Sequence, residues 1–265
     1  MAWQRQASQA KPMDSRNAFE VICEIEPPTT PDLGIVREQI AVLQPWCDAF
    51  LVPDSHLGRA TVSSIAVAHE VEYLQGRAVA CLNARDRNLL GLRRDLLTAR
   101  AYGVRELLFV YGDQPSEGER APMTVRRMLA EVREYAPELR IGVAADVTKP
   151  LPDWKRDADF LCTQLSFDSQ RVDQWCHDTA FDGRVYAGVV VFASDKMALR
   201  LMDRIPGLAV PESLITALTE GFVAGVEAAI EMVANLKASG AVDGVHLVPG
   251  RRFRETAAAL GRLAL

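Results

Sequence analysis

The amino-acid sequence predicts a single (β/α)8 barrel, in which parallel strands are surrounded by helices. The first observation is length, since 265 residues suit a one-domain barrel of about 250 residues. The second is alternation, because short apolar runs are followed repeatedly by stretches with helical spacing of apolar residues. The third is the number of strand-like runs, eight, which right-handed crossovers close into a barrel.

The expected strands and helices alternate along the chain. Strands are expected at 19–25, 48–53, 77–82, 105–111, 140–145, 159–165, 184–191 and 243–248. Helices are expected at 32–44, 59–74, 86–102, 122–135, 169–180, 194–204, 218–239 and 251–263. A doubly wound open sheet is the alternative, but such a sheet normally has a G-x-G-x-x-G turn after its first strand, and this sequence has none there.

One unit of the barrel is expected to lack a full helix. Residues 146–159, between the fifth and sixth strands, contain Pro150 and Pro152 and leave room for only about one or two helical turns. The barrel is therefore expected to have a shortened fifth helix. The polar residues 1–17 are expected to be a disordered leader, and residues 18–265 are expected to form one catalytic barrel domain.

Composition excludes several classes of function. A formal net charge of −5 gives no attraction to nucleic acid or to an anionic membrane surface. The sequence has no run of eighteen apolar residues and no apolar N-terminal region, so neither a membrane span nor a secretion signal is expected. The five cysteines occur singly, without a C-x-x-C motif, which favours a reducing compartment. We therefore expect a cytoplasmic protein whose partners are small molecules.

The side chains that end the expected strands are the candidates for chemistry, because barrel active sites lie at the C-terminal face. Most are acids and amides, namely Glu24, Glu26, Asp54, Asn83, Asp113, Asp146 and Gln164. The sequence has no H-E-x-x-H motif, no serine elbow and no histidine pair at ligand spacing, so neither hydrolytic zinc nor serine chemistry is expected, and no metal site. Carboxylates and amides suit general acid catalysis and binding of the donor edge of a heterocycle such as an aminopyrimidine.

The end of the first strand is the most informative stretch. It reads CEIEPPTTP over residues 23–31, so two acids stand just before a double proline. Alternation along the strand is expected to direct Glu24 and Glu26 to the same side, the interior mouth of the barrel. The alternative is a pair of solvated acids on an edge strand.

Five segments, in the same order, resemble the methylenetetrahydrofolate reductase family, whose fold is a (β/α)8 barrel. The first-strand stretch 23–31 is similar to the family's F-E-F-F-P-P-R-T, and FVYGDQP at 109–115 is similar to L-R-G-D-x-P. IGVAAD at 141–146 is similar to V-A-A-Y-P, CTQLSFD at 162–168 to I-T-Q-x-F-F-D, and GVHLVPGRR at 244–252 to H-F-Y-T-L-N-R. The resemblance extends from about residue 19 to the C-terminus.

The resemblance implies an activity and roles for single residues. The activity is reduction of 5,10-methylenetetrahydrofolate to 5-methyltetrahydrofolate in one-carbon metabolism. Glu24 falls on the general acid, Asp113 on the acid beside the pterin, and Gln164 on the amide that binds the pterin. Asp113 is therefore expected both to bind folate and to take part in catalysis. Glu26 is expected to help catalysis as the charged neighbour that keeps Glu24 protonated.

Two further residues are expected at the folate, each with an alternative. Phe167 can stack on a flat ring, although an aromatic residue at a strand end commonly packs in the core. Asp54 can contact folate or instead cap the helix that follows it. His246, within the last strand, is either a core histidine or a substrate contact.

Several substitutions fall on the flavin side of the family's pattern. CLNA at 81–84 replaces H-L-T-C, Tyr111 replaces an arginine, and Asp146 replaces a tyrosine. The helix that brings a lysine to the flavin phosphates is missing. The chain therefore most resembles the flavin-independent type known among actinobacteria, in which NADH passes hydride directly to the folate and FAD is absent.

The nicotinamide cofactor is expected to contact Asn83, Tyr111, Asp146 and Arg252. Two alternatives to this function remain open. One is an FAD-dependent reductase with a rearranged flavin site, and the other is a folate-binding paralogue without catalysis. Neither the choice between NADH and NADPH nor the oligomeric state is predicted.

Overall fold

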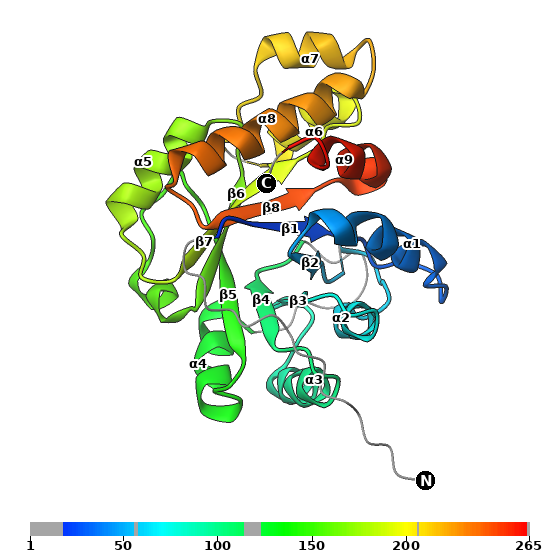
Figure 1. Ribbon diagram of the computed structural model, residues 1–265. Helices are drawn as coiled ribbons and strands as arrows, with labels where there is room; N and C mark the ends of the chain where they lie inside the picture. The colour runs from blue at the N-terminus through cyan, green and yellow to red at the C-terminus, as the bar shows by residue number, and fades with distance from the viewer. Residues whose placement is uncertain (1–17, 56–57, 114–122, 206, 264–265) are drawn as a thin grey trace.

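The computed structural model of the protein is a closed barrel in which eight parallel strands follow one another in chain order (Figure 1). It describes residues 18–55, 58–113, 123–205 and 207–263. The strands are β1 (Glu20–Glu24), β2 (Ala49–Val52), β3 (Ala78–Asn83), β4 (Glu106–Val110), β5 (Arg140–Ala145), β6 (Phe160–Leu165), β7 (Arg184–Val190) and β8 (Gly244–Val248). The predicted fold class is confirmed, whereas the expected leader at 1–17 lies outside the described residues.

The helices form a ring around the strands. They are α1 (Gly34–Leu43), α2 (Ser64–Tyr73), α3 (Leu89–Ala101), α4 (Val125–Tyr135), α5 (Ser169–Thr179), α6 (Asp195–Arg204), α7 (Glu212–Leu218), α8 (Val223–Ser239) and α9 (Phe253–Leu260). Three 3₁₀ turns were also found in the described residues, η1 (Gln44–Trp46), η3 (Asp153–Asp157) and η4 (Gly250–Arg252). The shortened fifth helix is confirmed, because η3 is the only helical element between β5 and β6, a segment that the structure describes throughout.

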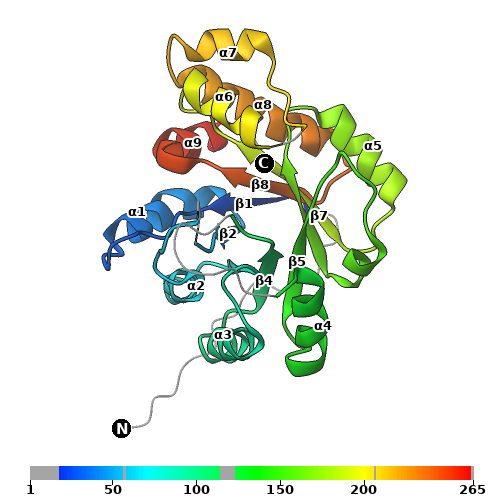
Figure 2. The same ribbon diagram turned by 180° about the vertical axis from the view of Figure 1, so that it is seen from behind.

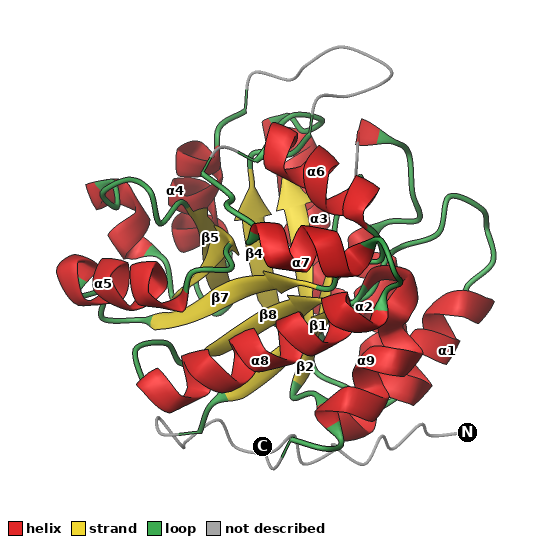
Figure 3. Ribbon diagram, turned by 90° about the horizontal axis from the view of Figure 1, so that it is seen from above, coloured by secondary structure: helices red, strands yellow, loops and turns green. Residues whose placement is uncertain are grey.

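Helix α7 was not predicted. Pro211 occupies the position before its first residue, and Gly221, with φ of +150°, lies between α7 and α8. The predicted helix at 218–239 therefore begins later, at Val223. Figures 1 and 2 show α7 at the outer edge of the molecule, and it packs against α6 and α8. Figure 3 gives the view from above.

The hydrophobic core has two layers because strand residues alternate between two faces. Cys23 and Ile25 face the helices, where they belong to the large core between sheet and helices. Ile22 faces the lumen, where it packs with other small and aromatic side chains. The lumen is therefore a filled core, and the open end of the barrel is the place for a ligand.

A charged cluster closes the N-terminal end of the barrel. Arg77 donates hydrogen bonds to Glu20 (2.9 Å) and to Glu106 (3.1 Å), and the Tyr186 hydroxyl donates to Glu20 (2.6 Å). Burial raises the pKa of Glu20, but Arg77, Tyr186 and Arg184 outweigh burial and hold this pKa below its usual value. These groups satisfy one another, so chemistry is expected at the opposite end.

Candidate active site at the barrel mouth

Glu24 and His246 meet at the C-terminal end of the barrel. Glu24 is the last residue of β1, and His246 lies in the neighbouring strand β8. The atoms His246 Nε2 and Glu24 Oε2 are 3.0 Å apart, and the two side chains are 12% and 9% exposed. An almost buried carboxyl group thus contacts a titratable ring, an arrangement that suits proton transfer.

Two thiols lie in the lumen below this pair. Burial, with a contribution from Glu24, raises the pKa of Cys81 well above its usual value. Burial followed by the charges of Glu106 and Glu24 raises the pKa of Cys162 to about 12. Both thiols are protonated and neutral at physiological pH, so the lumen next to the pair carries no thiolate nucleophile at these two positions.

Glu26 lies apart from this arrangement. Strand β1 ends at Glu24, and Glu26 is exposed beyond it, with its backbone N–H donating to Gln39 Oε1 (3.4 Å). Neither a hydrogen bond nor an ion pair joins Glu24 to Glu26 in the described part of the chain. The partner of Glu24 is His246, which the sequence pattern could have suggested through the closure of β8 onto β1.

Asp54 organises the ends of β2 and β3. Its Oδ2 atom accepts hydrogen bonds from the backbone and side-chain amides of Asn83, both at 3.0 Å, and from Arg87 Nη1. Burial raises the pKa of Asp54, and Arg87 offsets this only in part. The alternative that Asp54 caps the next helix is wrong, because α2 begins only at Ser64.

Both polar side-chain atoms of Asn83 form hydrogen bonds within the chain. It is 3% exposed, its Nδ2 donates to Asp54 and Asp86, and its Oδ1 accepts from the N–H groups of Arg85 and Asp86. Gly112 lies against it, so that a Cβ at Gly112 would stand 2.7 Å from the Asn83 Cβ. These contacts hold the β3 and β4 ends together and leave Asn83 no polar atom for the expected nicotinamide contact.

The end of β4 carries the next two candidates. Tyr111 is 43% exposed, and the Arg85 guanidinium lies 4.9 Å from its ring centroid. Asp113 is exposed at the rim of the barrel, next to the segment 114–122 that falls outside the described residues. The segment after β4 therefore carries an exposed aromatic ring and an exposed acid two positions apart.

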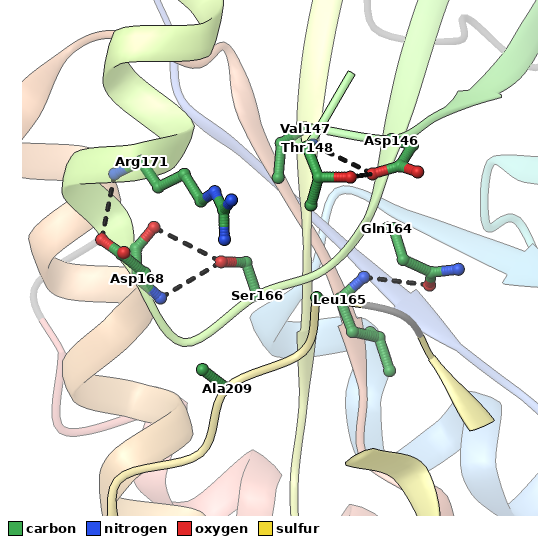
Figure 4. A pocket seen from close by; sticks show the side chains of 10 residues that line it. Asp146, Val147, Thr148, Gln164, Leu165, Ser166, Asp168, Arg171 and Ala209 are labelled. Atoms are coloured by element: carbon green, nitrogen blue, oxygen red, sulfur yellow. Dashed lines mark hydrogen bonds between the residues drawn. The ribbon is translucent and has the colours of Figure 1, made fainter. Parts of the chain in front are cut away.

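A second group of candidates lines a cavity between the ends of β5 and β6. Asp146 and Gln164 line it together with Arg171 from the first turn of α5 (Figure 4). Gln164 is exposed, and its Oε1 accepts a hydrogen bond from the Leu165 N–H (3.0 Å). A register shift between Cys162 and Leu165 sets the direction of this part of β6.

Asp146 is held by its own loop. Its carboxylate accepts hydrogen bonds from the Thr148 N–H (2.9 Å), the Thr148 hydroxyl (2.7 Å) and Lys149 Nζ (2.7 Å). Partial burial raises the pKa of Asp146, but these donors outweigh burial and lower it. Asp146 is thus an ionised group with its positive partner already in place.

Phe167 and Arg252 also find partners within the chain. The Phe167 ring stacks on Phe192 with centroids 4.9 Å apart, in the cluster that joins α6 and α7 to the barrel. The Arg252 guanidinium lies 3.7 Å from the Phe222 ring centroid and bonds Glu255 (3.2 Å). For Phe167 the structure favours the core alternative, and the nicotinamide role of Arg252 remains a prediction.

Two features are absent from the residues that the structure describes. These residues contain no group of three or more His, Cys, Asp or Glu side chains that could hold a metal ion. They also contain no helix with the length and apolar character needed to cross a membrane.

Comparison with known proteins gave one family model and many solved structures with a similar fold. The model of the family described as methylenetetrahydrofolate reductase matches residues 52–262, a range that leaves Glu24 outside. An uncharacterized Clostridium thermocellum protein that binds two copies of 5-methyl-5,6,7,8-tetrahydrofolic acid superposes with a TM-score of 0.70 and 14% identity, covering 93% of this chain and 95% of that one. The Bacillus cereus spore cortex-lytic enzyme SleL has a TM-score of 0.57 and 12% identity, with coverage of 93% and 74%. No curated protein matches the sequence.

Proposed function

Because the chain belongs to the methylenetetrahydrofolate reductase family, we propose that it reduces 5,10-methylenetetrahydrofolate to 5-methyltetrahydrofolate with NADH and without flavin. The observation that carries this proposal is Glu24, a carboxyl group that is 8% exposed at the mouth of the barrel and bonded to His246. A binding protein needs no such proton donor. The similar fold of a protein that binds 5-methyltetrahydrofolate supports the choice of ligand class.

Glu24 is the proposed proton donor to N10 of the substrate. Protonation of N10 breaks its bond to the bridging carbon, which leaves a 5-iminium cation. The iminium carbon then accepts a hydride from the reduced nicotinamide, and one proton and one hydride are consumed in each turnover. After its proton has left, the Glu24 carboxylate stabilises the cation electrostatically.

Asp113 and Gln164 are the proposed contacts for the pterin edge. Both side chains are exposed at the C-terminal end of the barrel, on the strand ends of β4 and β6. A pterin presents its N3–H and 2-amino groups as donors, and carboxylate and amide oxygens are acceptors. Binding therefore orients the bridging carbon relative to Glu24.

The residues on the flavin side do not fit FAD phosphates. The short turn η3 carries Lys155, whose Nζ donates to the Ala144 carbonyl (2.6 Å) and whose pKa is lowered by burial. Lys149 is paired with Asp146, and Asp146 adds a negative charge there. These occupied lysines support a nicotinamide as the direct hydride donor.

The five unpaired cysteines support a reducing cytoplasm as the site of action.

Catalytically silent folate binding is the second candidate, which is favoured by the relative that binds 5-methyltetrahydrofolate. Two measurements on the purified protein separate the candidates. Absorption near 450 nm tests for bound flavin, and NADH oxidation with methylenetetrahydrofolate, with and without added FAD, tests for turnover. We expect a colourless protein that turns over without FAD. Tightly bound FAD that turnover requires, or folate binding without turnover, contradicts the proposal.

Glu24→Gln tests the proton donor itself. The amide keeps the size and hydrogen bonding of the side chain but has no transferable proton, so kcat should fall by at least about 10²-fold. Affinity for 5-methyltetrahydrofolate should stay within about a few-fold. Glu26→Gln is the matched control, because Glu26 is an exposed glutamate two positions further along the chain, and its kcat should change much less. Normal turnover of Glu24→Gln removes the assignment.

A further inference from the structure

We propose that His246 is the proton relay of the site, which stores the proton and passes it to Glu24 when substrate covers the mouth. This inference rests on the proposed function and adds the route by which the proton arrives. His246 acts through Glu24 and does not touch the reacting atoms, so it is a positioning residue.

The proton needs a route because Glu24 is buried. The reaction consumes one proton per turnover, yet the Glu24 side chain is only 9% exposed, and a bound pterin covers the mouth further. The hydrogen bond that the structure gives the Glu24 carboxylate is the 3.0 Å contact with His246 Nε2. A proton that reaches Oε2 from inside the protein therefore comes through this ring.

The surroundings of His246 leave the pair free to exchange a proton. On the adjacent strands, the residues level with His246 are Ile22 of β1 and Gly188 of β7, and neither of them titrates. The titratable groups of the lumen cluster are Cys81, Cys162 and Tyr186, whose pKa values are raised by burial, so that all three stay protonated and neutral. Asp54, whose charge also acts on Cys81, is paired with Arg87. The three lumen groups add no charge that would fix the proton on one partner.

The second ring nitrogen of His246, Nδ1, is the atom at which the ring takes up a proton from water. Nδ1 makes no hydrogen bond to any residue in the described part of the chain, and it is not among the buried polar atoms that lack a partner. Water therefore reaches Nδ1 at the mouth. A proton taken up at Nδ1 releases the one on Nε2 toward Glu24, so the ring carries protons from water to the carboxylate.

Substrate binding provides the driving force for the transfer. Of the two ways in which this pair can hold one proton, an imidazolium beside a carboxylate separates charge and depends on surrounding water. Removal of water disfavours separated charges, so the neutral pair, with the proton on Glu24 Oε2, gains stability as the pterin binds. N10 then takes this proton, its bond to the bridging carbon breaks, and water restores the proton through Nδ1 before the next turnover.

His246→Gln tests the relay because glutamine can still donate a hydrogen bond to Glu24 but cannot carry a proton. An imidazole binds its proton about 2 pH units above a carboxylic acid in model peptides. The variant should therefore lose about 10²-fold in kcat/KM at pH 7.5, and the loss should shrink as the pH falls towards 5. His177→Gln, an exposed histidine on α5, is the matched control and should keep the wild-type profile.

Chemical rescue separates the relay from a merely structural role. His246→Ala should regain activity with added imidazole but not with pyrazole, which has a similar shape and does not titrate near neutral pH. A loss that is the same at every pH, without rescue by imidazole, overturns the relay while leaving the reductase activity of the wild type in place.

A measurement without turnover keeps the inference separate from the proposed function. In protein with ¹⁵N-labelled histidine, the His246 signals should change from imidazolium towards neutral imidazole when 5-methyltetrahydrofolate binds near neutral pH. His246→Gln identifies these signals by their loss. An unchanged protonation state on binding overturns the relay, whether or not the protein is an active reductase.

Discussion

Removal of the Arg87 side chain should destabilise the protein and reveal the buried charge of Asp54. Arg87 is 12% exposed at its side chain and contacts Asp54, Asp86 and Asp95, and Asp54 is 7% exposed. Loss of one partner of a buried ion pair costs about 3 to 5 kcal/mol. Because Asp54 keeps two hydrogen bonds from Asn83, we expect the lower end, about 3 kcal/mol for Arg87→Met.

The penalty should depend on pH in a defined direction. Burial already raises the pKa of Asp54, and loss of Arg87 raises it further. An acid whose pKa is raised in the folded state destabilises the protein at pH values above that pKa, and the penalty disappears as the pH falls through it. The difference between wild type and Arg87→Met should therefore be larger at pH 7 than at pH 5.

Denaturation by urea at both pH values measures this difference. Arg94→Met is the matched control, because Arg94 lies on α3, the helix that follows Arg87, with a side chain that is 76% exposed, and its effect should stay below about 0.5 kcal/mol. A loss below about 1 kcal/mol for Arg87→Met, or one that is equal at pH 7 and pH 5, refutes the interpretation of Asp54 as a buried charge held by Arg87.

Two other predictions concern the ligand and the closed end of the barrel. Asp113→Asn and Gln164→Ala should each weaken 5-methyltetrahydrofolate binding by about five- to a hundred-fold, since an unpaired polar group costs about 1 to 3 kcal/mol. Calorimetry should show a smaller change in the affinity for NADH. A larger loss of NADH affinity than of folate affinity contradicts the proposed orientation of the ligands. Tyr186→Phe removes the hydrogen bond to Glu20 and should cost about 1 to 2 kcal/mol. Folding lowers the pKa of Glu20 from its ordinary value of 4.5, so the stability lost in Tyr186→Phe should be present at pH values above 4.5 and should disappear as the pH falls. A loss of stability that persists in acid contradicts this prediction.

Much of the fold followed from periodicity. Each strand lies within about one residue of its predicted bounds, because alternation in a barrel strand is fixed by the two faces that it must fill. Helix α7 was missed because its sequence is short, between Pro211 and Gly221, and because it is added to the pattern of one helix after each strand. Its apolar side chains pack in the cluster that joins α6 and α7 to the ends of β7 and β8, and local sequence does not specify such an additional helix.

The candidate site was predictable only in part. The position of Glu24 at a strand end follows from the sequence, and closure of the barrel places β8 beside β1. The contact between Glu24 and His246 was not predicted, because it depends on the register of β8 against β1, which closure alone does not specify. Asn83 was expected to face a nicotinamide and instead joins two strand ends, because its partners come from separate loops. Strand ends thus predict which residues meet at the mouth, while their hydrogen-bond partners depend on the folded loops.

The most direct test of the proposed reaction follows one hydrogen atom. NADH carrying deuterium at the transferred position of C4 is incubated with methylenetetrahydrofolate and the purified protein, and the methyl group of the product is analysed by mass spectrometry. Direct transfer from the nicotinamide predicts one deuterium in each 5-methyl group, whereas transfer through a flavin exchanges the hydrogen with solvent. A methyl group whose new hydrogen comes from water, or the absence of any product, contradicts the account.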